Sequence, residues 1–233
     1  MPHKIKLLSW NIWYDCHFSE VVRFLDGADA DIIALQEIVV NDPARDTVTY
    51  LKNKGYAGVV MPHVEFTDNN GKHVKLNLGI FSKYPIIESS ERPLREGKGK
   101  GAMEAKIQIG EKVLSVFSVH LKHTHQESLP LQNEQADTLA TILPLEKGIV
   151  MGDFNSVPGS YPVTKMEEKY INTDVAGLPT WSVYPEGCPV CKPQKIDTKL
   201  DYIFVSPDLK WMSFEVGSSK GSDHLLVLVE GEI

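Results

Sequence analysis

Several carboxylate, amide and imidazole side chains of this 233-residue chain fall where short apolar runs end. Glu37 follows one such run, and Asp223 precedes another. Their carboxylates form an oxygen-rich pair with no cysteine beside it, and hard divalent cations prefer oxygen ligands of this kind. The pair therefore predicts a cation site, with Mg²⁺ as the expected metal and Mn²⁺ as the second choice. A surface carboxylate is the alternative interpretation of Glu37, and its place after a buried-looking run disfavours that alternative.

Further groups suited to acid–base chemistry lie at the ends of other apolar runs. Loops at the end of a rigid sheet hold such side chains in fixed positions and leave them accessible. The groups belong to six short segments that are scattered along the chain: Ser9-Trp10-Asn11, Leu35-Gln36-Glu37, Ser118-Val119-His120-Leu121, Gly152-Asp153-Phe154-Asn155, Leu200-Asp201-Tyr202-Ile203 and Ser222-Asp223-His224.

The elements that would position these segments follow from the hydrophobic pattern. Strands are predicted over residues 4–13, 31–38, 59–66, 74–81, 102–109, 113–120, 149–154, 200–205 and 225–230. Helices are predicted over residues 19–26, 43–54 and 132–143. Asp42 and Pro43 resemble an N-cap followed by the first helical residue, which sets the start of the second helix.

Two turns predict hairpins. Asn69-Asn70-Gly71 separates two strand-like runs, and Asn-Gly tolerates positive φ at both central positions. Gly110-Glu111 joins a second pair. Because no Pro/Gly/Ser-rich linker and no repeat interrupts the chain, residues 1–233 are predicted to form a single domain. Many strands with interspersed helices favour stacked sheets with helices on their outer faces.

Composition and charge exclude several classes of protein. Lys and Arg number 24 against 31 Asp and Glu, for a formal net charge of −7. Proteins that grip long nucleic-acid tracts neutralise many phosphates with Lys and Arg, so this balance argues against that mode of binding. Three cysteines cannot build a disulfide framework, which favours a reducing compartment. No apolar run approaches the roughly 20 residues of a membrane span, and the predicted location is cytoplasmic.

In this order, the six segments resemble the endonuclease/exonuclease/phosphatase superfamily, whose fold is shared by pancreatic-type deoxyribonuclease. The resemblance extends from residue 9 to residue 224. It implies an α/β four-layer sandwich, with two mixed β-sheets packed face to face and helices on the outer faces. It also implies hydrolysis of a phosphate ester with a divalent metal.

The resemblance further implies a role for each residue of the motifs. Glu37 would be the principal metal ligand, with Asn11, Asp153, Asn155 and Asp223 acting directly or through water. Asp153 would orient or deprotonate the attacking water, and Asn155 would hold the region of the attacked phosphorus. His120 and His224 would donate to phosphate oxygens, and Asp201 would pair with His224 and favour its charged form. Whether Asp153 or the Asp201/His224 pair is the base stays open at this point.

Two candidate substrate contacts lie outside the motifs. Lys98 and Lys100 belong to a basic, glycine-rich stretch that could engage distal phosphates, although a solvated loop explains the same composition. Trp181 precedes the Asp201 run and could form an aromatic wall for the leaving group. A core tryptophan is an equal alternative.

The remaining histidines and cysteines carry weaker signals. His3, His17, His63, His73, His123 and His125 follow no pattern and are predicted to be solvated loop residues. Cys188 and Cys191 form half of a zinc-binding pattern with no second pair after them, so a turn with two free thiols is the favoured interpretation.

The sequence therefore predicts a metal-dependent enzyme that hydrolyses a phosphodiester, either a small ester or a nucleic-acid end. A phosphomonoesterase or phospholipid phosphodiesterase is the alternative enzyme. A catalytically silent relative that binds a phosphorylated ligand is a further alternative, and the presence of every metal and histidine motif disfavours it.

Overall fold

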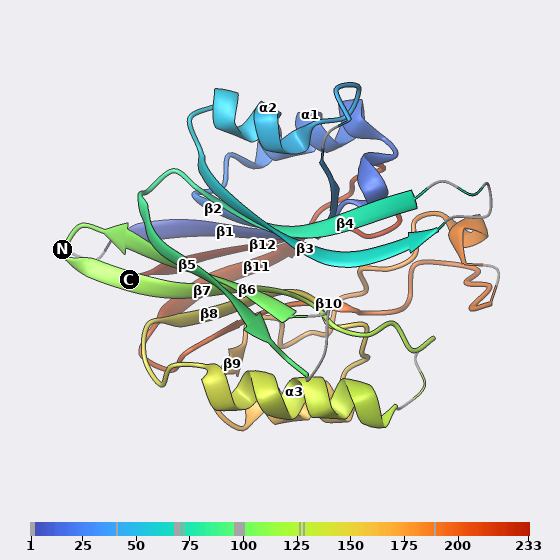
Figure 1. Ribbon diagram of the computed structural model, residues 1–233. Coiled ribbons are helices and arrows are strands. Elements are labelled where there is room, and N and C mark those ends of the chain that lie inside the picture. The colour runs from blue at the N-terminus through green and yellow to red at the C-terminus, as the bar shows by residue number, and fades with distance from the viewer. Residues whose placement is uncertain are drawn as a thin grey trace.

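The computed structural model describes residues 3–40, 42–67, 71, 73–95, 101–125, 127, 129–188 and 190–233. Two six-stranded mixed β-sheets pack face to face, with helices on both outer faces, as Figure 1 shows. The predicted fold class is confirmed. Among the described residues, no helix is long and apolar enough to cross a membrane.

The first sheet has the strand order β11-β12-β1-β2-β4-β3. Its strands are β1 (Lys4–Asn11), β2 (Ile32–Val39), β3 (Ala57–Thr67), β4 (His73–Ser82), β11 (Lys210–Val216) and β12 (Val227–Glu232). Only β1 and β2 pair in parallel within this sheet. Helices α1 (Phe18–Ala28) and α2 (Thr47–Asn53) cover its outer face.

The second sheet has the order β5-β6-β7-β8-β10-β9. Its strands are β5 (Ile86–Pro93), β6 (Gly101–Ile109), β7 (Lys112–His120), β8 (Gly148–Asp153), β9 (Ile171–Asn172) and β10 (Asp201–Val205). Strands β7 and β8 form its parallel pair. Helices α3 (Pro130–Ile142) and α4 (Tyr161–Glu167) lie on its outer face. Two short 3₁₀ turns, η1 (Trp13–Asp15) and η2 (Pro185–Gly187), follow β1 and precede β10.

A core of aliphatic side chains from both sheets fills the space between them, with Leu7, Ile80, Val116 and Ile203 among its fully buried members. The chain ends meet at one end of the sandwich, where the backbones of His3 and Ile233 exchange hydrogen bonds of 3.1 and 3.0 Å. The carboxyl ends of both parallel pairs point to the opposite end. Ligand sites in α/β sheets favour the carboxyl ends of parallel strands.

Several predicted boundaries need correction. The strand predicted over 4–13 ends at Asn11, because Trp13, Tyr14 and Asp15 adopt positive φ. The helix predicted from residue 43 begins at Thr47, because the side chain of Asp46, not of Asp42, accepts the capping bond from Thr49 N at 2.8 Å. Both predicted hairpins form, β3–β4 and β6–β7. Asn69 and Asn70 of the first turn lie outside the described residues.

Candidate active site

A cleft of about 370 Å³ opens at the end of the sandwich where the parallel strand pairs finish. It draws its walls from both sheets, from η1 and from the segments that follow β7 and η2. Among its lining residues are seven of the predicted catalytic and metal-binding residues: Asn11, Glu37, His120, Asp153, Asn155, Asp223 and His224.

Glu37 lies on a bulge of β2, where the pairing with β4 shifts between Leu35 and Ile38. Its φ of +60° is uncommon for a residue with a side chain, and the bulge turns its carboxylate into the cleft. The side chain is 13% exposed, and among the described residues its Oε2 has no hydrogen-bond partner. Burial, followed by repulsion from Asp223, raises the pKa of Glu37 to about 8. A buried carboxylate with one such oxygen is stabilised by a cation.

Asn11 and Asp223 lie near this carboxylate in the same cleft. Asn11 ends β1, and its Nδ2 donates to Asp153 Oδ2 at 3.2 Å. Half-buried Asp223 accepts a bond of 3.1 Å from the indole Nε1 of Trp181. The register that pairs Asn11 with Gln36 sets Asn11 beside Glu37 at the ends of parallel strands.

Asp153 ends β8 and is only 1% exposed. Its Oδ1 accepts the backbone N–H of Asn155 at 2.7 Å, and its Oδ2 accepts from the side-chain amides of Asn11 and Asn155 at 3.2 and 3.3 Å. Burial raises the pKa of Asp153, and the nearby charge of His224 opposes that rise. The carboxylate is therefore held in one orientation, and its pKa is shifted toward the neutral range in which a general base works best.

Asn155 adopts a φ of +48° and turns back toward β8. Its Nδ2 also donates to Leu121 O at 3.1 Å, and its Oδ1 lies 2.9 Å from His123 Nδ1. Both its donor and its acceptor are thus engaged by the protein.

His224 lies against Asp201, with 2.8 Å between its Nδ1 and Asp201 Oδ2. The same Asp201 oxygen accepts from the Thr180 hydroxyl at 2.6 Å. Burial of the ring lowers its pKa, but attraction from Asp201, Asp153 and Asp223 outweighs that effect and leaves the pKa well above its usual value. The three carboxylates therefore favour the charged form of the imidazole, whose Nε2 lies 3.7 Å from Asp153 Oδ2. Asp201 stands behind the ring, because β8 and β10 set it opposite Asp153 in the sheet.

His120 ends β7 on the other side of Asp153. Its Nε2 lies 3.5 Å from Asp153 Oδ2 and 3.8 Å from Glu37 Oε1. The ring of His63, from β3, stacks on it with 5.2 Å between centroids. His120 therefore bridges the two carboxylates that come from different sheets.

The prediction that His63 and His123 are solvated loop residues is wrong. His63 lies on a strand and is 4% exposed, and His123 is half-buried against Asn155. His17 is half-buried as well and stacks on Tyr184 with 5.0 Å between centroids. Tyr14 also lines the cleft, and repulsion from Glu37 raises its pKa. His63 lies on a strand that carries none of the motifs, and Tyr14, His17 and His123 follow no regular spacing. No pattern in the sequence therefore indicates their positions at the site.

The candidate substrate contacts have different outcomes. Trp181 lines the cleft but is 4% exposed, so the geometry favours the alternative of a core tryptophan whose indole N–H positions Asp223. Lys98 and Lys100 lie outside the described residues.

The donor set fits a hard divalent cation. Glu37 supplies a carboxylate oxygen without a partner among the described residues, and the oxygens of Asn11, Asp153 and Asp223 line the same cleft. Oxygen ligands with several carboxylates are typical of Mg²⁺ and Mn²⁺ sites.

Comparison with known proteins places the chain in a family. The sequence signature of the Endonuclease/Exonuclease/phosphatase family matches residues 8–224. Among curated proteins, none matches the chain by sequence.

Three solved structures show how widely the fold is shared. A family protein from Bacteroides thetaiotaomicron is 17% identical, with a TM-score of 0.75 over 100% of this chain and 99% of its own. Truncated Caenorhabditis elegans TDP2 is 17% identical, with a TM-score of 0.71 over 99% and 98%. ANGEL2, a 2′,3′-cyclic phosphatase, is 16% identical, with a TM-score of 0.72 over 99% and 95%. At these identities the structures show a common fold, and together with the signature over residues 8–224 they identify the chain as a member of the Endonuclease/Exonuclease/phosphatase family.

Proposed function

We propose that the protein is a divalent-metal-dependent phosphoesterase that hydrolyses a phosphodiester. The observation that carries this proposal is the convergence of Glu37, Asp153 and His224 on one cleft, although 187 residues separate the first from the last. A carboxylate suited to a cation, a carboxylate suited to a base and a cationic imidazole are what in-line hydrolysis of a phosphate ester requires.

Glu37, with Asn11, Asp153 and Asp223 beside it, would hold the cation, with Mg²⁺ expected and Mn²⁺ possible. When bound, the cation neutralises phosphoryl oxygens and stabilises the charge that develops on the leaving oxygen.

The protein's own side chains divide the remaining work. Asp153 takes the proton of the attacking water, because its bonds from Asn11 and Asn155 fix its orientation and its raised pKa suits a base. His224 stays protonated beside Asp201 and donates from Nε2 to a phosphoryl oxygen. His120 lies on the other side of Asp153 and can donate there as well. Asn155 positions the base, since its own polar atoms are already bonded within the protein.

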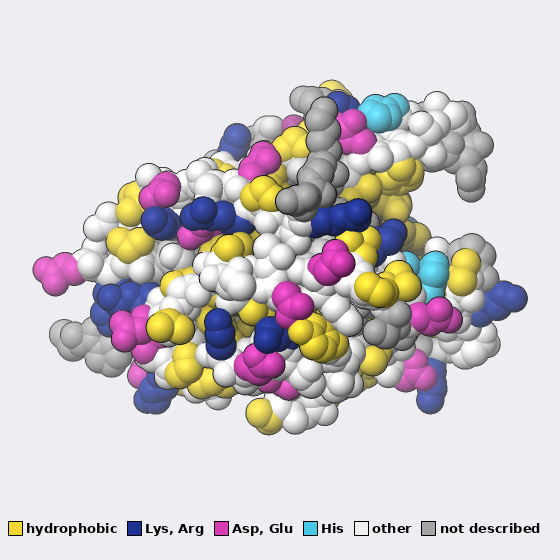
Figure 2. Space-filling model, turned by 60° about the horizontal axis from the view of Figure 1, so that its bottom comes forward, with side chains coloured by type: hydrophobic (Ala, Val, Ile, Leu, Met, Phe, Trp, Pro, Cys, Tyr) yellow, Lys and Arg dark blue, Asp and Glu magenta, His cyan; other side chains and the backbone are white. Residues whose placement is uncertain are grey.

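The size and charge of the molecule favour a small ester or a nucleic-acid end over a long duplex. A cleft of about 370 Å³ holds only part of a polymer, and on the face in Figure 2 the basic and acidic side chains of the described residues are interspersed. ANGEL2, which shares the fold, is a 2′,3′-cyclic phosphatase, and a cyclic diester belongs to the small class proposed. A cytoplasmic location is the matching proposal for its site of action.

Turnover of a substrate panel tests the proposal. Monoesters, linear and cyclic diesters, nucleic-acid ends and lipid headgroups would be assayed with Mg²⁺, with Mn²⁺ and with a chelator. We expect metal-dependent release from a diester, and we expect Glu37→Gln to abolish it with the circular dichroism spectrum unchanged. Glu230→Gln, at an exposed position of β12, is the matched control.

Three results would change the assignment. Preferential turnover of a monoester or of a lipid headgroup would favour the alternative enzymes. Binding of phosphate esters without turnover would favour a silent phospholigand-binding relative. Near-normal turnover by Glu37→Gln would remove Glu37 from the metal site.

A further inference from the structure

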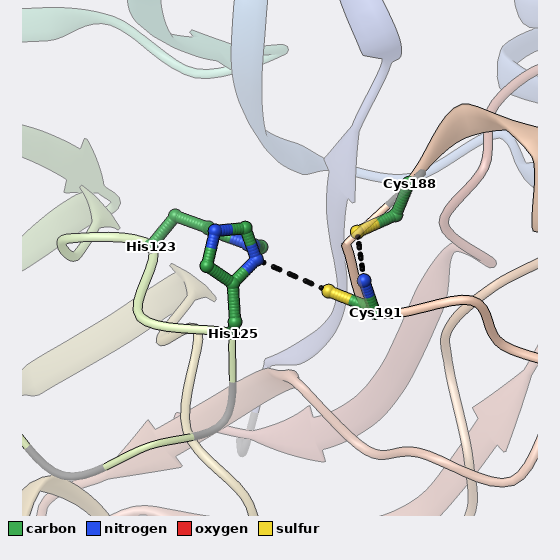
Figure 3. Close-up of side chains that lie close together, drawn as sticks. All are labelled: His123, His125, Cys188 and Cys191. Atoms are coloured by element: carbon green, nitrogen blue, oxygen red, sulfur yellow. Dashed lines mark hydrogen bonds between the residues drawn. The ribbon is translucent and has the colours of Figure 1, made fainter.

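Four metal-ligating side chains meet at the rim of the cleft, outside the cation site. His123 and His125 lie in the segment that follows β7, and Cys188 and Cys191 follow η2. One donor atom from each of the four lies within 4.8 Å of every other. Figure 3 shows the two imidazoles and the two sulfurs facing one another across the gap between the two segments.

The distances within this cluster are slightly shorter than those between two ligands of one metal ion. His123 Nε2 is 2.8 Å from His125 Nδ1, and His125 Nδ1 is 3.2 Å from Cys191 Sγ. A tetrahedral zinc ion with bonds of about 2.0 to 2.3 Å separates its ligand atoms by roughly 3.3 to 3.8 Å, so small side-chain rotations bring the four atoms onto one ion. Two thiolates with two imidazoles are a donor set that selects Zn²⁺ over the hard cations suited to Glu37.

We propose that His123, His125, Cys188 and Cys191 bind one structural Zn²⁺. Hydrogen bonds within the protein favour the metal-binding forms of His123 and Cys188. Asn155 Oδ1 lies 2.9 Å from His123 Nδ1 and accepts a hydrogen bond from the Nδ1–H group, so in the neutral ring Nε2 carries no proton and is directed at the cluster. The backbone N–H of Cys191 donates to Cys188 Sγ at 3.0 Å, a bond that stabilises a thiolate.

The competing interpretation is a redox-active or solvated pair of cysteines. It accounts for the Cys-x-x-Cys turn, but it gives no reason for two imidazoles from a segment 63 residues upstream to face the same sulfurs. A shared cation accounts for all four side chains together.

With four protein ligands, the ion has no open position and acts as a clamp. It would tie the segment with Cys188 to the segment with His123, and both segments line the cleft. Hydrogen bonds connect this zinc site with the proposed Mg²⁺ site, because His123 contacts Asn155 and the backbone N–H of Asn155 donates to Asp153. The segment with Cys188 also packs against η1. The Trp13 ring lies so close to Gly187 that a Cβ on Gly187 would be 3.2 Å from it.

Zinc content tests the proposal without reference to catalysis. Tag-free protein, purified in reductant and dialysed against Mg²⁺-containing buffer, should retain about one Zn²⁺ per chain by elemental analysis. The double variant Cys188→Ser/Cys191→Ser and the variant His125→Ala should lose it. Cys16→Ser, which removes the exposed free cysteine, should keep it. Glu37→Gln should also keep it, which separates this result from any failure of the proposed phosphoesterase function.

A second measurement guards against variants that do not fold. Co²⁺ added to reduced, metal-free wild-type protein should produce the intense visible bands of a tetrahedral thiolate complex, and Zn²⁺ should displace them. Retention of zinc by the double cysteine variant, Co²⁺ spectra typical of octahedral oxygen ligands, or reduced wild-type protein that binds neither metal would overturn the assignment. So would a Cys188–Cys191 disulfide that gives no metal site when it is reduced.

Discussion

At the scale of single residues, two of the site residues carry backbone angles that side chains seldom adopt. Glu37 has a φ of +60° and Asn155 a φ of +48°. Such conformations cost about 1 to 3 kcal/mol each and persist where the surroundings hold them. At Glu37 the β2 bulge holds it, and at Asn155 the bonds to Asp153 and Leu121 do. In both cases the unusual angle delivers a side chain to the cleft.

We propose that Asp153 is the base and that His224 is a protonated donor, and these two roles predict different pH profiles for two variants. Asp153→Asn and His224→Ala should each lower kcat by about 10² to 10⁴. Asp153→Asn should also remove the acid limb of kcat/KM, because the group whose deprotonation creates that limb is gone. The profile of His224→Ala should keep its acid limb. Steady-state kinetics across pH distinguish the two. Loss of the acid limb in His224→Ala alone would instead assign the base to the Asp201/His224 pair.

Asp201 is expected to act through His224. Its negative charge holds the pKa of His224 well above the usual value, so Asp201→Asn should lower that pKa. The basic limb of kcat/KM should therefore move to lower pH, with a smaller loss of rate at pH 6 than at pH 8. A general structural defect would lower the rate equally at all pH values, and that result would contradict this role.

The sequence predicts which residues form the site better than it predicts the contacts that these residues make. Strand-end motifs place Glu37, Asp153 and His224 near the ends of β-runs. In the structure Asp153 ends β8, Glu37 lies on the bulge of β2, and His224 lies shortly before β12. The contacts of His63 and His123 could not be predicted, because they depend on which strand and which loop fold over the motif residues. The roles of the residues came from the resemblance rather than from their spacing.

At the scale of elements, the spacing between β7 and β8 sets the distance between His120 and Asp153. These two residues are partners in the parallel register. Gly152 precedes Asp153 with a φ of +153°, and a Cβ at this position would lie 2.0 Å from Val119 O. Only glycine allows β8 to approach β7 this closely.

Gly152→Ala should therefore impair both stability and catalysis. We expect a loss of about 1 to 3 kcal/mol in the free energy of unfolding, because β7 and β8 must separate. The rate should fall as well, since His120 and Asp153 move apart. Gly27→Ala in α1 is the matched control, because a Cβ there meets nothing within 4 Å and should stabilise the helix by about 0.4 to 1 kcal/mol. Denaturant unfolding measures both, and an unaffected Gly152→Ala protein would show that the sheet tolerates the added carbon.

Elements with a clear hydrophobic period are predictable from the sequence, and the edge strands β5 and β11 are not. The central strands β1, β2, β7, β8 and β10 are buried almost throughout and form recognisable apolar runs. Strand β5 shows no strand pattern because mostly exposed Glu-Ser-Ser-Glu residues fill its middle, and β11 shows none because a bulge between Trp211 and Ser213 interrupts its alternation. Pairing with a neighbouring strand, rather than local propensity, makes these two segments strands.

At the scale of the whole molecule, one cleft depends on two sheets meeting in one orientation. Glu37 comes from the first sheet and Asp153 from the second, and no local pattern relates the two. Their proximity, bridged by His120, is a property of the sandwich. The same packing buries several ionisable groups, so folding and proton binding are linked.

The metal-free protein should lose stability as pH rises from about 5.5 to 8.5. Burial raises the pKa of Glu37 from its usual 4.5 to about 8 and that of Asp15 from 3.8 to about 6. Each folded group therefore binds its proton more tightly than the unfolded chain does, and its contribution is full below the unfolded pKa and lost as pH rises through the folded one. The raised pKa of His224 has the same sign above its usual 6.5. Exposed carboxyls such as Asp26, whose pKa is lowered, titrate below this window and do not oppose the trend.

A divalent cation should reverse this dependence, because it binds the ionised form of Glu37 and its neighbours. The rise in Tm on adding Mg²⁺ should thus be larger at pH 8.5 than at pH 5.5. Thermal unfolding at both pH values, with Mg²⁺ and with a chelator, measures the effect. Glu37→Gln should weaken both the pH dependence and the gain from Mg²⁺, whereas Glu230→Gln should change neither. A Tm that climbs with pH in the metal-free protein, or a gain from Mg²⁺ that is equal at both pH values, would mean that the buried carboxylates of the cleft are not what the cation stabilises.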